Sequence, residues 1–293
     1  MKILLAIDGS ECSDRAANFL TRFNYSPQDE IIVLHVISEI PYEDDSYANI
    51  KRFMKRVAPR ILESTANILK PVRAKVIKRE EEGYPDITIM EVAEDADVDL
   101  IVMGTRGIKG IKSVFIGSIT RSVAINSLKP VLVTRHPQWD VSINMKVLLA
   151  TDGSDSAHAT AELLASMPFH PDTEFLILSV SYSAFSDIPE QFTMEISDKI
   201  KEDVARIKAI EYEKAYQILE QSRALLSKRF AHIEGLVRVG DPSIEILNAA
   251  ERSQADIIAV GCRGLKGIKG MMGSVSRRIL GHSQGAVLIG KPR

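Results

Sequence analysis

The sequence predicts an α/β protein of two tandem domains, each with a five-stranded parallel sheet that carries helices on both faces. Three observations support this prediction. The chain of 293 residues suits two domains better than one, since domains usually hold roughly 100 to 200 residues. Apolar strand-like segments alternate with helix-like segments, a pattern typical of parallel sheets with crossover helices. The same pattern occurs twice along the chain.

The internal repeat is visible in two long stretches. The matching segments are 2–17 with 146–160, and 81–110 with 238–267. A polar stretch at 135–144, which contains a proline, joins the copies. The predicted division is a first domain at 1–138, a linker at 139–144 and a second domain at 145–293.

The first half of each copy follows from its residue pattern. In the first copy, the continuous apolar run at 3–7 predicts a strand buried on both faces of a sheet. Ser10 suits the N-cap of a helix that runs to about residue 23. The run at 30–38 predicts a second strand, and 48–70 a helix that Pro59 should kink. The apolar residues of that helix fall roughly on one face: Ile50, Met54, Val57, Ile61 and Ile68.

The second half of the copy continues the alternation. A third strand is expected near 72–78, followed by a helix that begins at Pro85, a residue favourable at the first helical position. A fourth strand at 99–104, a helix from Ser118 and a last strand at 130–134 complete the domain. Ligands in folds of this kind bind beyond the carboxyl ends of the strands.

The stretch GTRGIKGIKSVFIGS at 104–118 lies between the fourth strand and the next helix. Its glycines Gly104, Gly107 and Gly117 let backbone N–H groups approach an anion, and the helix that begins at Ser118 adds unpaired N–H groups. The set predicts a phosphate cradle; the alternative is a turn that only closes a β–α loop. A Walker loop is excluded because no lysine precedes Ser118. A dinucleotide fingerprint is absent after the first strand.

The spacing Gly104-x2-Gly107-x9-Gly117-Ser118, with Asp8 at the end of the first strand, resembles the nucleotide-binding signature of the universal stress protein family. The resemblance covers essentially the whole chain twice, so the chain is similar to a tandem member with two Rossmann-like domains. It implies ATP or AMP as ligand, alone or with Mg²⁺. In the first copy it implies a frame for adenine and ribose, contacts to ribose and the first phosphate, and contacts to the outer phosphates. The residues in these three roles are, in turn, Ala6, Asp8 and Val36; Met103, Gly104, Arg106 and Gly107; and Gly117, Ser118 and Ile119.

The second copy carries a matching set of candidate nucleotide-binding residues. They are Ala150, Asp152, Val180, Val260, Gly261, Arg263, Gly264, Gly273, Ser274 and Val275. Its loop is one residue shorter between Gly264 and Gly273 than the loop of the first copy. Since the difference falls at the outer phosphates, we expect the second site to prefer AMP or ADP relative to the first.

These features favour an ATP- or AMP-binding regulatory protein of the stress response, a sensor or switch, over an enzyme. The sequence shows no Ser/His/Asp order and no GxSxG elbow. Asp8 is expected at the base end of the nucleotide, far from the terminal phosphate, so it is badly placed to orient a water for hydrolysis. Two alternatives stay open: a slow ATPase or phosphotransfer enzyme, and a structural pseudo-dimer in which one or both sites have decayed.

Composition limits the partners. A net charge of −2 gives no overall field toward nucleic acid or an anionic membrane, and no apolar run approaches the roughly 18 residues of a membrane span. The apolar run before Asp8 is too short for a signal peptide. Cys12 and Cys262 lack disulfide-like or metal-like spacing, so we expect a reduced, cytoplasmic setting. The basic segments 51–56 and 223–229 are interpreted as solvated helix faces.

The family resemblance also implies how the copies assemble. Their last strands, within 129–136 and 285–293, are expected to meet across a pseudo-twofold interface, which would bury two sheet edges inside one chain. The result is an intramolecular pseudo-dimer. Association of whole chains into a homodimer, and the identity of a protein partner, stay open.

Overall fold

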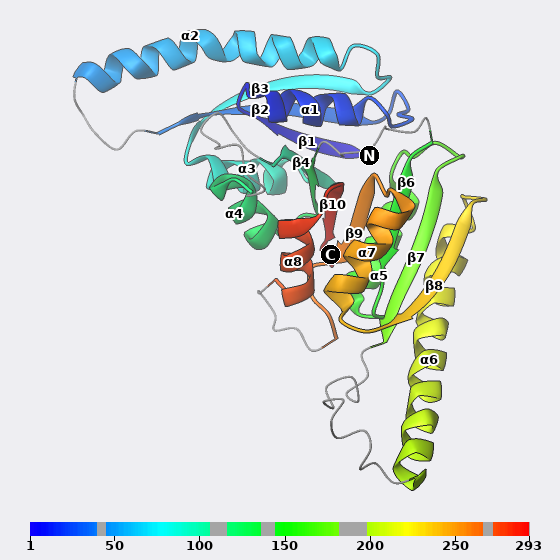
Figure 1. The fold of residues 1–293 in the computed structure, drawn as a ribbon. Helices are drawn as coiled ribbons and strands as arrows, with labels where there is room; N and C mark the ends of the chain where they lie inside the picture. The colour runs from blue at the N-terminus through cyan, green and yellow to red at the C-terminus, as the bar shows by residue number, and fades with distance from the viewer. Residues whose placement is uncertain (40–44, 106–115, 136–143, 182–197, 266–271, 293) are drawn as a thin grey trace.

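The computed structural model describes residues 1–39, 45–105, 116–135, 144–181, 198–265 and 272–292, and its strands form one continuous sheet (Figure 1). The strand order is β3-β2-β1-β4-β5-β10-β9-β6-β7-β8. The strands of the first domain are β1 (Lys2–Ile7), β2 (Glu30–Ser38), β3 (Lys75–Gly83), β4 (Leu100–Gly104) and β5 (Val131–Thr134). Those of the second are β6 (Lys146–Ala150), β7 (Glu174–Ser181), β8 (Ile233–Val239), β9 (Ile257–Gly261) and β10 (Ala286–Gly290).

Each half of the sheet is parallel, which confirms the predicted fold class. The two halves join where β5 and β10 pair antiparallel, with Val133 opposite Val287. This is the predicted meeting of the two last strands. Each strand thereby covers the edge that the other would leave open.

Helices cover both faces of the sheet. In the first domain they are α1 (Glu11–Leu20), α2 (Asp45–Ile68), α3 (Pro85–Asp95) and α4 (Ser118–Asn126). In the second they are α5 (Asp155–Ser166), α6 (Asp198–Leu226), α7 (Pro242–Ser253) and α8 (Ser274–His282). None of these described helices has the length and apolar character that a membrane span requires.

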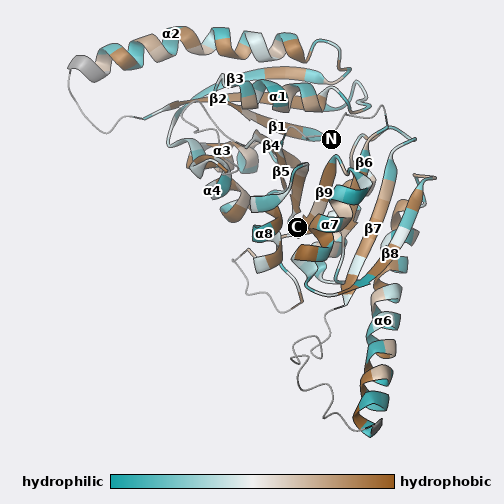
Figure 2. Ribbon diagram, viewed as in Figure 1, coloured by the Kyte–Doolittle hydropathy of each residue, from teal (hydrophilic) through white to brown (hydrophobic). Residues whose placement is uncertain are grey.

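Two apolar cores lie on opposite faces of the sheet because successive strand residues point to opposite sides. Ile3 and Leu5 of β1 belong to the core under α1, α2, α5 and α6, whereas Leu4 and Ala6 belong to the core under α3, α4, α7 and α8. Both cores continue from one domain into the other. In Figure 2 the central strands are mostly brown, while α2 and α6 alternate between brown and teal.

Element boundaries lie close to the predicted ones except at the third strand. Ser10 caps α1 as predicted, since its Oγ accepts from Ser13 N at 3.3 Å. α2 continues through Pro59, which lies on the exposed side of the helix, where water can take the carbonyl that proline leaves unpaired. The third strand begins and ends later than predicted, because β3 follows β2 along its whole length in register. Its residues are mostly charged, as is typical of a solvated edge strand, so the strand has no long apolar run that would predict its position.

The two domains are locked together by an apolar and ionic interface. The rings of Phe23 and Phe169 lie 5.2 Å apart between centroids, and Asn24 N donates to Pro168 O at 2.7 Å. Beside them, Arg22 Nη1 donates to Asp256 Oδ1 at 2.9 Å, and the Asp256 side chain is only 3% exposed. The chain is therefore built as one body.

Two equivalent cations also cross from one domain to the other. After β5, Arg135 Nη2 donates to Leu280 O at 2.6 Å, in α8; after β10, Lys291 Nζ donates to Ile125 O at 3.1 Å, in α4. Carbonyl groups of a last helical turn carry partial negative charge, which a cation stabilises. Each of the two last helices is thus held by the strand end of the other domain.

Candidate functional site

In each domain, the candidate site lies where the strand order reverses. β1 and β4 are neighbours although they are far apart in sequence, and β6 and β9 are their equivalents. Chain segments leave the carboxyl ends of these neighbours in different directions, which opens a crevice at the sheet edge.

The first strand of each domain ends in an Asp-Gly-Ser turn. In the second domain, Asp152 Oδ1 accepts from Ser154 N at 3.0 Å, Gly153 has a φ of 77°, and Ser154 caps α5 through Ala157 N. The first domain repeats the turn, with Asp8 Oδ1 accepting from Ser10 N at 3.0 Å. The positive φ explains the glycine. The turn orients the aspartate at the sheet edge, and its bond from the serine N–H is compatible with a contact to a ligand.

The helix after each glycine loop begins without a side-chain cap. The N-caps are Gly117 for α4 and Gly273 for α8, and neither helix has an acidic residue in its first turn. The other four helices whose N-caps are described all carry one there. An acidic residue is the usual partner of the positive end of a helix. Its absence from these two helices leaves their ends open to an external anion.

The backbone N–H groups of the two N-cap glycines already donate hydrogen bonds. Gly117 N donates to Thr105 O at 2.7 Å, and Gly273 N donates to Cys262 O at 2.8 Å. The first helical bonds come from Arg121 N and Arg277 N. The three N–H groups between, at 118–120 and 274–276, have no acceptor within their helix. An anion would therefore meet the N–H groups that follow the glycine.

A side-chain bond fixes each of these helix ends to its strand. Thr120 Oγ1 donates to Gly104 O at 2.9 Å, and Ser276 Oγ donates to Gly261 O at 2.6 Å. Sequence reasoning missed both residues. The signal was available, since Thr120 and Ser276 are hydroxyl residues at the same offset after the cap glycines.

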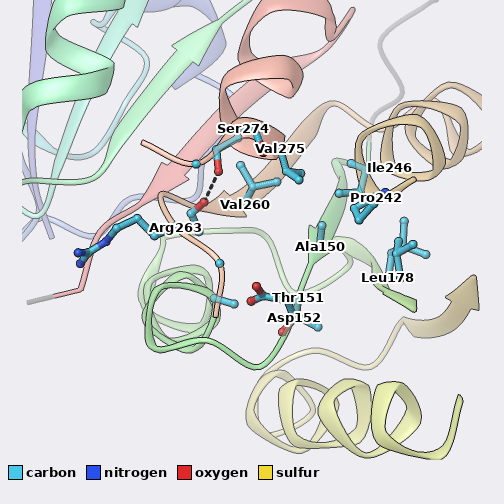
Figure 3. A pocket seen from close by; sticks show the side chains of 16 residues that line it. Ala150, Thr151, Asp152, Leu178, Pro242, Ile246, Val260, Arg263, Ser274 and Val275 are labelled. Atoms are coloured by element: carbon cyan, nitrogen blue, oxygen red, sulfur yellow. Dashed lines mark hydrogen bonds between the residues drawn. The ribbon is translucent and has the colours of Figure 1, made fainter. Parts of the chain in front are cut away.

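In the second domain, a cavity of about 410 Å³ lies at this edge (Figure 3). It brings together all ten residues that the sequence singled out in this copy, from Ala150 to Val275. Its lining also includes residues that sequence reasoning missed: Thr151, Ala157, Leu178, Pro242, Ile246 and Ser276. Leu178 lies two residues before Val180 on the same side of β7, and Ile246 lies one turn after Pro242 on α7. Glycines and strand ends leave signals in the sequence, whereas α7, which closes the apolar side of the cavity, leaves none of this kind.

The cavity has an apolar and a polar end. Leu178, Pro242 and Ile246 lie together on one side, and Asp152 and the start of α8 on others (Figure 3). Asp152 Oδ2 also accepts from Leu265 N at 3.2 Å. An added Cβ at Gly264 would lie 2.7 Å from that same oxygen, so glycine is needed for this close approach.

Arg263 contributes to the lining differently from a phosphate-binding side chain. Its backbone carbonyl accepts from Ser154 Oγ at 3.1 Å, while its side chain extends away from Ala150, Asp152 and Leu178 (Figure 3). The charge of Arg263 also acts on Lys291. Burial is the main cause that lowers the pKa of the Lys291 amine; Cys262 raises this pKa, and the positive charge of Arg263 lowers it further. The second glycine loop therefore lies next to the cation that reaches α4 of the first domain.

The first domain arranges its predicted residues in the same way. Ala6, Met103 and Gly104 are buried at the ends of β1 and β4, Asp8 and Val36 are half-buried, and Ser118 and Ile119 are exposed at the start of α4. An added Cβ at Gly104 would lie 2.6 Å from Cys12 O, so this glycine is required by packing against α1. The predicted residues Arg106 and Gly107 lie outside the described residues.

The family model described as universal stress protein family matches residues 1–135 and again 144–291. The chain belongs to the universal stress protein family. Each Usp match coincides with one half of the ten-stranded sheet, so this chain carries two domains of the family.

Relatives in the family match either one domain or the whole chain. A universal stress protein of Methanocaldococcus jannaschii is 32% identical over 153 residues, covering 46% of this chain and 94% of its own length. One of Mycolicibacterium smegmatis is 24% identical over 311 residues, covering 99% of this chain and 97% of its own. The crystal structure of a universal stress protein from Archaeoglobus fulgidus has a TM-score of 0.63 at 24% identity, covering 99% of this chain and 96% of that one. The Mycolicibacterium smegmatis relative and the Archaeoglobus fulgidus structure thus match this chain over nearly its whole length.

Proposed function

We propose that each domain binds an adenine nucleotide, ATP or AMP, and that the chain acts as a nucleotide-dependent sensor or switch in a stress response. The observation that carries the proposal is the pair of acid-free, glycine-capped helix ends of α4 and α8 at the two sheet crevices. A helix N-terminus of this kind suits a phosphate group. An adenine nucleotide, the ligand that the family resemblance implies, carries such a phosphate group.

The cavity of the second domain supports a ligand with one apolar and one anionic end. Its volume of about 410 Å³ falls within the range of small-molecule sites. Leu178, Pro242 and Ile246 offer apolar contacts to a flat base, and the N–H groups at the start of α8 offer donors to phosphate. Asp152 is placed to accept from ribose hydroxyl groups. A nucleoside phosphate satisfies all three surfaces.

The geometry supports binding rather than hydrolysis. Asp152 is the one carboxylate in the lining of the described cavity, and both of its oxygens already accept backbone N–H groups, from Ser154 and Leu265. A carboxylate used in this way is a poor base for an attacking water. We propose that any ATP turnover is slow.

The experiment is calorimetric titration of the wild-type chain and two variants with ATP and with AMP. An added Cβ at Gly273 would find its nearest neighbour 3.5 Å away, so Gly273→Val should fold, yet its side chain occupies the path of a phosphate to α8. Gly281→Val is the matched control, in the same helix with nothing within 4 Å of an added Cβ. We expect two sites in the wild type and the control, and one in Gly273→Val. Absence of nucleotide binding by the wild type would overturn the proposal.

A further inference from the structure

The last helix of each domain begins at its own candidate phosphate site and ends at a cation of the other domain. Both α4 and α8 start at a glycine N-cap with no acidic residue in the first turn. In the last turn of α4, Ile125 O accepts from Lys291 Nζ at 3.1 Å. In the last turn of α8, Leu280 O accepts from Arg135 Nη2 at 2.6 Å. Each helix therefore connects a site in one domain with a side chain from the other.

The two carbonyl groups that accept these bonds lie where a helix needs outside donors, because no further N–H group follows its last turn. In α4, a longer helix would offer the N–H group of Lys129 to Ile125 O, but this group donates to Ser127 Oγ at 3.0 Å. Ile125 O takes its donor from the other domain instead. A cation at this end and a phosphate at the opposite end both stabilise the aligned peptide dipoles of the helix.

A short series of backbone hydrogen bonds connects Lys291 to the phosphate site of its own domain. Gly273 N, at the N-cap of α8, donates to Cys262 O at 2.8 Å, and Cys262 N donates to Gly290 O at 2.9 Å. Gly290 directly precedes Lys291. A Cβ added at Gly290 would collide with Thr160 of α5, so the backbone at this place is packed closely against that helix. The position of the Lys291 side chain thus depends on the backbone of the second site.

The first domain makes the equivalent connection to Arg135. Gly117 N, at the N-cap of α4, donates to Thr105 O at 2.7 Å. Thr105 follows Gly104, which lies opposite Thr134 in the pairing of β4 with β5. Thr134 directly precedes Arg135. The two connections cross, since the start of α4 is linked to the end of α8 and the start of α8 is linked to the end of α4.

We infer that the two sites bind nucleotide with positive cooperativity, with Lys291 and Arg135 as positioning residues that each act on the phosphate-binding helix of the other domain. The inference rests on the proposed function. A phosphate at the start of α8 fixes the backbone from Gly273 to Lys291, and the lysine side chain then holds the end of α4. Because α4 is already ordered, a nucleotide that enters the first site loses less conformational freedom on binding. Arg135 transmits the effect in the opposite direction, and each site raises the affinity of the other by the same factor, about fivefold.

The test measures amide hydrogen exchange in full-length chains that keep one site. In Gly117→Val, saturating ATP fills the second site alone, and exchange in the last turn of α4 should slow about fivefold. Adding Lys291→Met should abolish this effect, because methionine cannot donate to Ile125 O. Adding Lys291→Arg should preserve it, since a guanidinium group can donate there. Lys129→Met is the matched control and should also preserve it, because this lysine lies near the same helix but pairs with Asp97 of its own domain.

The reciprocal arm uses Gly273→Val, in which ATP fills the first site alone. Exchange in the last turn of α8 should then slow, and Arg135→Met rather than Lys291→Met should abolish the effect. With both sites intact, the double variant Arg135→Met Lys291→Met should still bind two nucleotides per chain in calorimetry. Each site should then bind with the affinity that it has when the other is empty.

The crossed pattern, in which each cation affects the helix of the other domain alone, supports the inference. Binding of two nucleotides with no change of exchange in the distant helix overturns the inference but leaves the proposed function intact. The same holds for an effect that survives Lys291→Met and Arg135→Met. Equal loss at both helices in either variant also overturns the inference, because it indicates a loosened domain contact rather than a link from site to helix. A wild type that binds no nucleotide overturns the proposed function and the inference with it.

Discussion

Arg22→Met tests whether the two domains form one thermodynamic unit. Arg22 extends from the end of α1 to Asp256 of the other domain, whose side chain is 3% exposed, while that of Arg22 is 20% exposed. In the wild type, the Arg22 guanidinium lies over the ring of Phe19. Methionine would keep an apolar side chain at this place, but it would leave the Asp256 carboxylate without its cation. Removing one partner of a buried ion pair costs about 3 to 5 kcal/mol. Since Asp256 Oδ2 keeps its bond from Lys146 N and Arg22 is partly solvated, we expect about 3 kcal/mol, the lower end of that range.

The assay is urea unfolding followed by circular dichroism, with thermal melting as a second readout. A loss of about 3 kcal/mol should lower the melting temperature by roughly 5 to 10 °C in a single transition. Arg15→Met, which breaks the exposed pair with Glu11, is the control and should cost less than about 0.5 kcal/mol. Combining Arg22→Met with Asp256→Asn should recover about 1 to 2 kcal/mol, because no buried charge is then left unpaired. Equal stability of Arg22→Met and the wild type, or melting of one domain alone, would refute the reasoning.

Three further predictions concern the sites and the contact between them. Gly117→Val should remove nucleotide binding from the first domain and leave the second intact, so calorimetric stoichiometry should fall by one site while the melting temperature holds; unchanged stoichiometry would argue against this placement. Titrating ATP and AMP into Gly117→Val and Gly273→Val separately should show a lower ATP-to-AMP affinity ratio at the second site, because a lost charge-assisted bond to phosphate is worth roughly 1.5 to 3 kcal/mol; equal ratios would count against a role for the shorter loop. Burial lowers the pKa of Lys291 in the folded chain below its ordinary value of 10.5. At a pH between these two values, the Lys291 amine is protonated in the unfolded chain and neutral in the folded chain. The free energy of unfolding of the wild type should therefore rise with pH across that interval. Lys291→Met should flatten this rise in urea unfolding measured as a function of pH, and an unaltered pH dependence would contradict the assignment.

The fold could be predicted because apolar runs and turn residues repeat in both copies. The run at 30–38 is β2 in full, and Pro85 begins α3, since a buried strand and a proline at a helix start leave local signals. β3 was misplaced because an edge strand rich in charged residues has no long apolar run. Its position is set by pairing with β2, which is a tertiary effect.

The site could be predicted in outline for a similar reason. Glycines and the Asp-Gly-Ser turn are local signals of backbone geometry, and they carry the family resemblance that implies the ten second-domain residues, all of which line one cavity. Pro242 and Ile246 could not be found in this way. They belong to α7, and only the tertiary packing of that helix on the sheet brings them to the cavity. The direction of the Arg263 side chain likewise depends on its surroundings in the fold (Figure 3).

Native mass spectrometry of the wild-type chain titrated with ATP, and separately with AMP, tests the central claim most directly. The two equivalent helix ends of α4 and α8 predict that the mass rises in two steps, each equal to one nucleotide per chain. Gly117→Val and Gly273→Val should each show one step, and the double variant none. A wild-type chain that takes up no nucleotide, or a double variant that still takes up two, would contradict the account.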